Sequence, residues 1–389
     1  MDYINKLSNL QMVTLITTGR TGTDYLQSTF DSHPEILTFN GSLWLHTFWS
    51  KSICINNSRG NIVLDDLIFE FIGLHLEKLK SQYDILERKD QLGDNSDQFL
   101  NIDLEKFRDD IKITLQGKVI NSKSFLIAVY AAYGIQTGYD LEGVKVILHH
   151  IHHFDKLDPF ISDFPNAKII CMTRDPRANF VSGIENHRLY NIATDHNAHL
   201  YHNIKRILND STPLKIYSNE YITIKLEDLG NMKIILKLCD WLKIRYHISM
   251  EKSTWGGLQW KGDRVSKRKN NVKGFSEKML DNKWESKLSF IDKYLLNYIM
   301  FNRIKYYDYP YKKITYLDSL IIPFFILMPL SYELRFFSFK YLLNNIKSGN
   351  YKIIVSNFFY YLKRINLFFK FYTKTVTKKI YDEPLLKIK

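Results

Sequence analysis

The sequence contains little cysteine, and this scarcity excludes two classes of small, cross-linked protein. Its three cysteines, Cys54, Cys171 and Cys239, are too few for a disulfide framework or for a zinc site with four thiolates. The start of the chain also lacks the positively charged and apolar segments of a secretory signal. We therefore expect a cytoplasmic protein in a reducing environment.

Long apolar runs and tandem repeats are missing as well. The longest apolar run, Leu320–Leu330, has 11 residues and contains Pro323 and Pro329. A helix that crosses a bilayer needs about 20 apolar residues. The run is therefore expected to enter a membrane interface without crossing the membrane.

Positive charge is concentrated near the C-terminus. Residues 311–389 contain 14 lysines and arginines against 4 aspartates and glutamates, which gives +10 of the net charge of +13. The same segment carries 19 of the 50 tyrosines and phenylalanines. This change of composition predicts a boundary near Tyr311, between a domain at 1–310 and a basic extension at 311–389.

Short apolar segments alternate with helical patterns over residues 1–245. Apolar, β-branched runs that end at turn residues predict strands, and apolar spacings of three and four predict helices between them. Such alternation is typical of an α/β protein whose central parallel sheet is flanked by helices and binds ligands at the carboxyl ends of its strands. A mostly helical insertion is expected at about 43–143. The predicted strands are 12–18, 35–40, 144–149, 168–173 and 221–226.

The first candidate site is the loop after the first predicted strand. Its glycines allow a tight turn that exposes backbone N–H groups, and the helix N-terminus and Arg20 add positive charge. These features favour a phosphate-like anion, although an ordinary strand-to-helix turn is the alternative. The loop is not a Walker A motif, because the four-residue gap and the Gly-Lys-Ser/Thr ending are missing. Its residues are Gly19, Arg20, Thr21, Gly22, Thr23 and Asp24.

The second candidate site follows the fourth predicted strand. Arg174 lies at the strand end, and Ser182 lies eight residues later on the following helix. An arginine and a hydroxyl so placed converge on one anionic group, with Arg177 nearby. The alternative is a salt-bridge corner in which Asp175 caps the helix.

Together the two motifs resemble the sulfotransferases that use 3′-phosphoadenosine 5′-phosphosulfate (PAPS). In that family a strand–loop–helix grips the 5′-phosphosulfate, and an Arg and a Ser eight residues apart hold the 3′-phosphate. The resemblance implies a P-loop-like sulfotransferase fold, PAPS as the donor and no metal. It assigns binding of the 5′-phosphosulfate to Gly19–Asp24, where Arg20 contacts the transferring group. It assigns binding of the 3′-phosphate to Arg174 and Ser182.

Other segments extend the resemblance over about residues 10–300. His33-Pro34 follows the first helix, and Ile224–Ile244 resembles the family's strand, Glu-Asp-Leu and helix segment. Three positions depart from the pattern or match it weakly. Asp24 replaces a threonine and is expected to serve the helix N-terminus, Leu226 replaces a tyrosine, and the late basic loop is recognisable only as Arg264–Lys273.

The family's general base is either a histidine at the end of a middle strand or a glutamate soon after the first helix. Residues 37–49 contain no carboxylate, whereas the strand 144–149 leads into four histidines within residues 149–153. Alternation places His150 and His152 on one face. The separation from Arg174 favours His152, with His150 and then His46 as alternatives. An imidazole with an ordinary pKa near 6.5 suits this role.

A metal site is the rival interpretation of the histidines. Strand geometry cannot direct His149, His150, His152 and His153 to one tetrahedral ion. Outside the sulfotransferases, a P-loop kinase or nucleotide hydrolase is the alternative enzyme. A membrane-surface protein with a decayed catalytic site, in which Asp24 is the lesion, is the alternative from a different class.

The acceptor and the C-terminal segment are less specific. The spacing of Trp255, Trp260 and Trp284 resembles carbohydrate sulfotransferases and favours a hydroxyl, or an amine, of a saccharide or glycolipid. Residues 351–372 form a basic amphipathic pattern, which predicts a helix on an anionic membrane at the inner face. A helix packed on the protein core is the alternative, and no nucleic acid is expected. The apolar positions of this pattern are Ile354, Phe358, Tyr361, Leu362, Ile365, Phe368, Phe369 and Tyr372.

Overall fold

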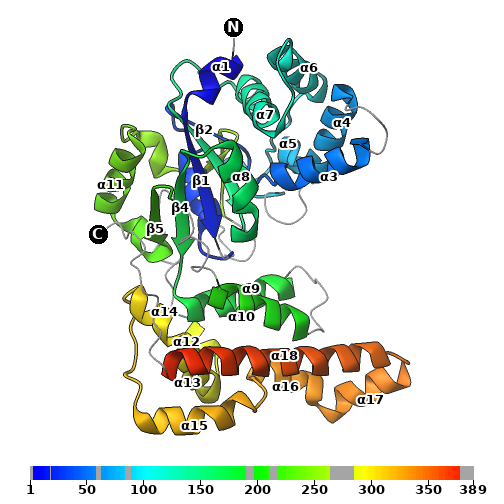
Figure 1. Cartoon of the computed structure of the whole chain (residues 1–389), viewed down its shortest axis with the longest axis vertical. Coiled ribbons are helices and arrows are strands. Elements are labelled where there is room, and N and C mark those ends of the chain that lie inside the picture. Colours follow the sequence, from blue (N-terminus) through cyan, green and yellow to red (C-terminus); the bar gives the residue numbers. More distant parts are fainter. Residues whose placement is uncertain are drawn as a thin grey trace. The chain divides into compact units, whose positions relative to one another are not determined.

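A computed structural model of the chain describes residues 3–17, 19–57, 63–83, 89–189, 197–209, 218–262 and 284–376. The chain forms two compact units (Figure 1). Unit 1 comprises Met1–Met172, Tyr217–Leu280 and Leu385–Lys389, and unit 2 comprises Thr173–Ile216 and Asp281–Pro384.

A five-stranded sheet forms the centre of the fold and has the strand order β2-β3-β1-β4-β5. β1 pairs in parallel with β3 and β4, and β2 pairs in parallel with β3. The predicted α/β fold with a central parallel sheet is confirmed, and each predicted strand forms. The strands are β1 (Gln11–Thr17), β2 (Ile36–Thr38), β3 (Val146–His152), β4 (Lys168–Thr173) and β5 (Tyr221–Lys225).

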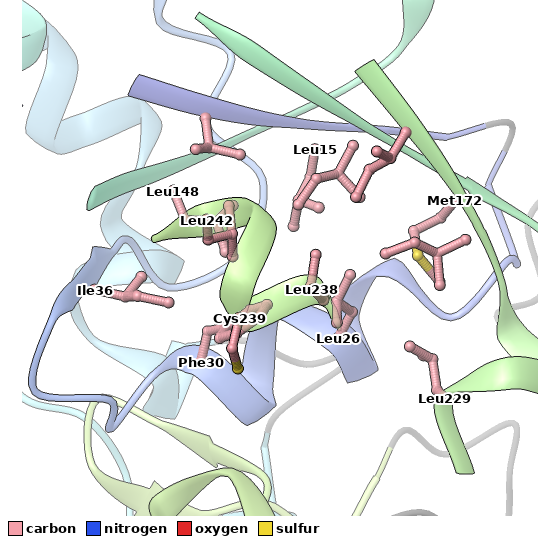
Figure 2. Close-up of a cluster of buried hydrophobic side chains, with 14 of the residues drawn as sticks. Leu15, Leu26, Phe30, Ile36, Leu148, Met172, Leu229, Leu238, Cys239 and Leu242 are labelled. Atoms are coloured by element: carbon pink, nitrogen blue, oxygen red, sulfur yellow. The ribbon is translucent and has the colours of Figure 1, made fainter. Parts of the chain in front are cut away.

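One face of the sheet packs on α2 (Thr23–Phe30) and α11 (Met232–Leu242) (Figure 2). Leu15 and Leu148 from the strands meet Leu26 of α2 in a single apolar cluster. The strands are nearly continuous in buried residues, as expected for a parallel sheet covered on both faces. α11 begins directly after Asn231, because Asn231 Oδ1 accepts a hydrogen bond from the N–H of Lys233 (3.0 Å) and caps the helix.

The segment between β2 and β3 is helical, as predicted for the insertion. α6 and α7 pack against each other and against α1 (Tyr3–Ser8). Capping explains where they begin: Asp103 accepts from two N–H groups of α6, and Asn121 and Ser124 form a capping box at α7. The helices are α3 (Leu45–Asn57), α4 (Leu64–Leu74), α5 (Leu76–Leu79), η1 (Ser81–Tyr83), α6 (Leu104–Leu115) and α7 (Ser122–Gln136).

Shorter elements complete the described part of unit 1. A hairpin of β6 and β7 was not predicted, because two-residue strands leave no periodic signal. These elements are η2 (Phe154–Lys156), α8 (Leu157–Asp163), η4 (Leu226–Gly230), η5 (Ile248–Glu251), β6 (Thr254–Trp255) and β7 (Leu258–Gln259).

Unit 2 is helical in its described residues beyond the end of β4. Its longest helix, α18, packs on α10, α13 and α15, so packing continues across Tyr311. The two units therefore divide the chain differently from the predicted domains at 1–310 and 311–389. The helices are α9 (Pro176–Leu189), α10 (Asn197–Asn209), α12 (Trp284–Lys287), α13 (Phe290–Ile299), α14 (Phe301–Tyr306), α15 (Tyr316–Ile326), α16 (Ser331–Phe337), α17 (Phe339–Lys347) and α18 (Tyr351–Val376).

Candidate active site

The loop between β1 and α2 has an unusual backbone. Gly19, Arg20 and Gly22 have φ angles of 80°, 58° and 84°, in the left-handed region that favours glycine. Gly22 is doubly constrained, because a Cβ built on it would lie 2.4 Å from Leu226 Cδ1. The glycine pattern that marked this loop in the sequence therefore has a geometric cause.

Threonine hydroxyls hold this loop from within. The N–H of Gly19 donates to Thr17 Oγ1 (2.9 Å), which also shares a hydrogen bond with Thr21 Oγ1. Thr21 Oγ1 lies 3.3 Å from Thr23 Oγ1. Thr17 was not singled out in the sequence, because a threonine at a strand end has no distinguishing pattern. The ligand roles predicted for Thr21 and Thr23 stay predictions, and both side chains are buried.

Two predicted catalytic residues share a rare backbone conformation. Among the described residues, only six other than glycine have positive φ, and both Arg20 (58°) and His152 (77°) are among them. Holding such a residue in this region costs about 1–3 kcal/mol, and such strain gathers at functional sites. The remaining four are Asp90, Ser96, Lys243 and Asp308.

The positive φ of His152 accompanies a bulge at the carboxyl end of β3. Leu15 of β1 pairs with His150, whereas the next residue, Ile16, pairs with His152. Ile151 is therefore an extra residue in the ladder. The bulge leaves His152 Nδ1 only 3.1 Å from His150 Nε2. Because His152 pairs with Ile16, it lies at the sheet edge from which the β1–α2 loop leaves.

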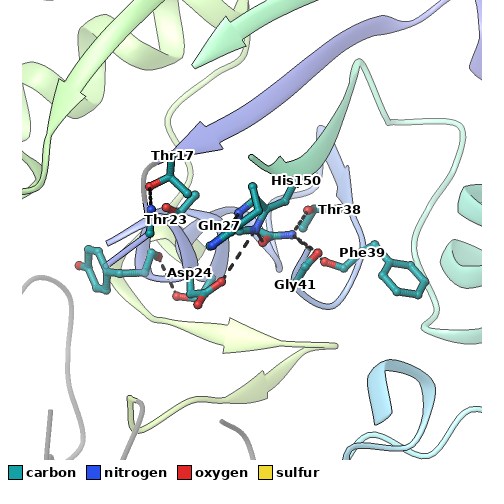
Figure 3. Close-up of polar contacts among 12 residues, drawn as sticks. Thr17, Thr23, Asp24, Gln27, Thr38, Phe39, Gly41 and His150 are labelled. Atoms are coloured by element: carbon teal, nitrogen blue, oxygen red, sulfur yellow. Dashed lines mark hydrogen bonds and ion pairs between the residues drawn. The ribbon is translucent and has the colours of Figure 1, made fainter. Parts of the chain in front are cut away.

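Gln27 of α2 determines where His150 carries its proton (Figure 3). Gln27 Nε2 donates to the carbonyl oxygens of Phe39 (2.8 Å) and Gly41 (3.3 Å). Carbonyl oxygens only accept, so the amide nitrogen must face them and Oε1 must face His150. Oε1 lies 2.9 Å from His150 Nδ1, which therefore donates and carries the proton of the neutral ring.

The same logic extends to His152. With Nδ1 protonated, neutral His150 has its lone pair on Nε2 and accepts a hydrogen bond from His152 Nδ1. The neutral His152 ring then has its lone pair on Nε2, which is the atom that a general base needs. Gln27 was missed in the sequence, because a lone glutamine on a helix carries no motif.

Asp24 lies beside this hydrogen-bonded chain. Its Oδ1 is 3.8 Å from His150 Nδ1, and its side chain is about one-third exposed (38%). It also occupies the first turn of α2, as predicted for a residue that serves the helix N-terminus. The carboxylate therefore lies within ion-pair distance of His150.

The other histidines of this region belong to different surroundings. His149 is fully buried, stacks on Phe160 and contacts the hydroxyl of Tyr130 (3.1 Å). Burial holds the pKa of His149 well below its usual range. His46, the remaining alternative base, pairs with Asp163 (2.9 Å) and is 8% exposed. In the described parts of the chain, no three His, Cys, Asp or Glu side chains form a group that could hold a metal ion.

An aromatic and basic cluster adjoins His152. The His153 ring lies 4.6 Å from the His152 ring and 5.9 Å from that of Trp44, measured between centroids. Lys156 Nζ lies 4.5 Å from the centre of the Trp44 ring, and Trp44 is 44% exposed. Trp44 follows β2 and was not predicted as a site residue.

The second motif lies in unit 2. The guanidinium of Arg177 is paired with both oxygens of Asp175 (2.9 and 2.7 Å), donates to Asn297 (2.7 Å) and stacks on Trp284. Asp175 Oδ1 also accepts from the N–H of Arg177, so Asp175 caps α9. The salt-bridge corner is therefore present, and Arg177 serves it. The half-buried Arg174 and Ser182 keep their predicted roles as predictions.

The tryptophans that favoured a carbohydrate acceptor are buried. Trp255 and Trp260 pack together with Leu92, and Trp284 packs on Arg177. These rings serve packing, and the saccharide preference taken from their spacing stays a prediction. The predicted basic loop, Arg264–Lys273, lies outside the described residues.

No protein-family model and no curated protein matches the chain. Among solved structures, it is similar to the sulfotransferase domain of the Synechococcus PCC 7002 olefin synthase, with 16% identity, a TM-score of 0.38, and coverage of 72% of this chain and 88% of that chain. It is also similar to a sulfotransferase domain from the curacin biosynthetic pathway, with 14% identity, a TM-score of 0.36, and coverage of 71% and 91%. TM-scores below 0.5 transfer no activity, so the functional proposal depends on the residues of this chain.

Proposed function

We propose that this protein is a PAPS-dependent sulfotransferase in which His152 is the general base. One observation carries the proposal. The hydrogen bonds from Gln27 to His150 and from His150 to His152 leave a basic imidazole nitrogen on His152, at the carboxyl end of the strands where the loop with Arg20 begins. Base and anion-binding loop are both needed to transfer a charged group to a hydroxyl or amine.

The β1–α2 loop fits a phosphosulfate by its donor set. It combines the positive charge of Arg20, glycine-permitted turns and the N-terminus of α2. When bound, PAPS would supply an activated sulfuryl group and would leave as 3′,5′-adenosine bisphosphate. Arg174 and Ser182 are proposed to hold its 3′-phosphate, as the motif resemblance implies.

The proposed roles of the histidines, Gln27 and Asp24 rest on their contacts, and that of Arg20 rests on the motif resemblance. His152 Nε2 removes the proton of the acceptor, and the resulting positive charge is shared with His150 and stabilised by Asp24. Gln27 keeps His150 in the required tautomer. Arg20 provides a fixed positive charge where negative charge develops during transfer.

The acceptor is proposed to be a saccharide or glycolipid. Trp44 supports this choice in place of the buried tryptophans, because it is partly exposed and lies in the cluster next to His152. A flat aromatic face and a few polar groups are typical of sites that orient such ligands.

Sulfate transfer from labelled PAPS to fractionated glycans and lipids tests the proposal. The His152→Ala protein should lose transfer by about a hundredfold or more and keep its affinity for 3′,5′-adenosine bisphosphate. His247→Ala is the matched control, because His247 is an exposed histidine of unit 1. Full transfer by His152→Ala contradicts the assigned base. Stabilisation by Mg-ATP, with none by the bisphosphate, would instead favour a kinase or hydrolase.

A further inference from the structure

Unit 2 exposes an apolar surface that the proposed transfer chemistry does not use. On α15 and the turn after it, the outward positions are apolar and are between 46% and 81% exposed. Monomeric soluble proteins rarely expose large contiguous apolar patches without a partner. The residues are Tyr316, Leu317, Leu320, Phe324, Leu327 and Met328.

The first half of α18 presents a second stripe of this kind. Its exposed apolar residues recur at steps of three and four, so they lie along one face of the helix. They are between 47% and 67% exposed. We call the α15 and α18 residues together the apolar surface. The α18 residues are Tyr351, Val355, Phe358, Phe359 and Leu362.

The α15 segment is not a single membrane-spanning helix. The 22-residue stretch Tyr316–Phe337 contains an 18-residue window that is apolar enough for a span by composition. However, α15 ends at Ile326 and α16 begins only at Ser331. The 11 residues of α15 extend about 16 Å, which is about half the thickness of a bilayer core.

Buried contacts fix the break between α15 and α16. Arg364 of α18 donates to the carbonyl oxygens of Ile326 (2.6 Å) and Met328 (2.9 Å). The hydroxyl of Tyr361 donates to the carbonyl of Leu327. These hydrogen bonds satisfy the carbonyl oxygens that the end of α15 leaves unpaired, so they stabilise the turn. They also hold α15 against α18.

The structure also revises which side chains of α18 face outward. The predicted membrane face included Phe368, which is fully buried, and Tyr361, whose hydroxyl is bound to the α15 turn. Packing on the protein, the alternative left open for this helix, therefore holds for part of the predicted face. Phe358 and Leu362 belong to the part that stays exposed.

The helices α17 and α18 are rich in positive charge. No aspartate or glutamate occurs between Glu333 and Asp382. Lys363 lies over the ring of Phe359, with its Nζ 4.2 Å from the ring centre, so charge and apolar area are interleaved. Interfacial helices on anionic lipid combine these two features. The exposed lysines of α17 and α18 are Lys340, Lys347, Lys352, Lys363, Lys370 and Lys374.

We propose that unit 2 docks on an anionic lipid bilayer through the apolar surface, with α15 and α18 lying in the interface. The lysines attract the anionic headgroups, and the apolar side chains enter the acyl boundary. The short α15 and the fixed turn after it keep the segment on the membrane rather than across it.

Co-sedimentation of the full chain with vesicles tests this docking. Sucrose-loaded vesicles of phosphatidylcholine are compared with vesicles containing about 30% phosphatidylserine, at low and high salt. The wild-type protein should bind the anionic vesicles and be partly released by salt. Leu320→Gln/Phe324→Gln should weaken binding about tenfold or more, including the part that salt does not release. Lys352→Gln/Lys370→Gln should weaken mainly the salt-sensitive part.

Matched controls distinguish docking through the apolar surface from nonspecific vesicle binding and from misfolding. Phe69→Gln and Lys106→Gln change exposed residues of unit 1 and should leave vesicle binding unchanged. Circular dichroism should show the same helix content in every variant. Equal loss in variants and controls, or no binding by wild-type protein, overturns the proposal. A wild-type dimer that Leu320→Gln/Phe324→Gln converts to a monomer also overturns it, because a second copy then covers the surface.

Discussion

His150 and His152, two residues apart on one strand, are hydrogen-bonded to each other at the point where Ile151 is bulged between them. In a regular strand, side chains two apart point the same way but stand about 6–7 Å apart. The bulge therefore converts two neighbouring histidines into a coupled pair. Gln27 fixes one end of the pair, and His152 Nε2 is the other end.

Replacing Gln27 tests whether the tautomer chain matters for transfer. In Gln27→Leu, His150 Nδ1 loses its acceptor, and neither ring of the pair is held in one tautomer. We expect kcat to fall by about tenfold to a hundredfold, which is the range for removing a residue that orients a ligating histidine by a hydrogen bond. The pH profile of kcat should shift, and KM for the donor should change little.

The control for this variant is Gln136→Leu. Gln136 also donates a hydrogen bond, but it lies at the end of α7 and its acceptor is Asp110 of α6. An unchanged pH profile in a folded Gln27→Leu protein would show that Gln27 has only a structural role. Rescue by Gln27→Asn is not expected, because a shorter amide does not reach both partners.

Arg20 combines a proposed catalytic charge with a strained backbone. Arg20→Ala and Arg20→Gly both remove the guanidinium, so both should lower turnover by about a hundredfold or more. Their stabilities should differ, because glycine adopts φ near 58° without the penalty that alanine incurs. We expect Arg20→Gly to be more stable than Arg20→Ala by about 1 kcal/mol in urea unfolding. Equal stability would argue against strain at this position.

The sequence predicts the scaffold of the site better than its working details. The positions of the strands and of the β1–α2 loop follow from apolar runs and glycines, which are patterns of neighbouring residues in the sequence. The coupling of His150 to His152 depends on a bulge, and the role of Gln27 depends on carbonyl groups of Phe39 and Gly41 that only the folded chain brings together. Burial also has no local signature, so the spacing of Trp255 and the other tryptophans gave no sign that their rings are buried.

Two buried histidines predict that stability falls in mild acid. Burial lowers the pKa of His75 from 6.5 to about 4, and burial also lowers that of His149. Between these values the unfolded chain binds a proton that the folded chain excludes. The two histidines therefore cost no stability above about pH 6.5, and the free energy of unfolding decreases as the pH falls from there towards 4.

His75→Asn isolates the contribution of one histidine. Asparagine keeps a donor for the carbonyl of Phe71, which His75 Nδ1 contacts at 3.0 Å, but it does not titrate. Each such group adds up to about 1.4 kcal/mol per pH unit to the slope of stability against pH. Urea unfolding from pH 7 to 4.5 should give a smaller slope for His75→Asn. Phe69→Gln, at an exposed residue of α4 that does not titrate, should keep the wild-type slope, and an equal decrease in both variants would refute the assignment.

The ion pair between Glu333 and Arg364 links α16 to α18 and is fully buried on both sides. Burial raises the pKa of Glu333, although Arg364 opposes the shift. Arg364→Met leaves that carboxylate without its partner, and we expect a loss of about 3–5 kcal/mol in urea unfolding. Adding Glu333→Leu should recover much of this loss, because the uncompensated buried charge is then gone. Arg335→Met, at an exposed arginine of α16, is the control and should change stability by less than about 0.5 kcal/mol. A similar loss in Arg335→Met, or no recovery in the double variant, would show that the pair does not hold these helices together.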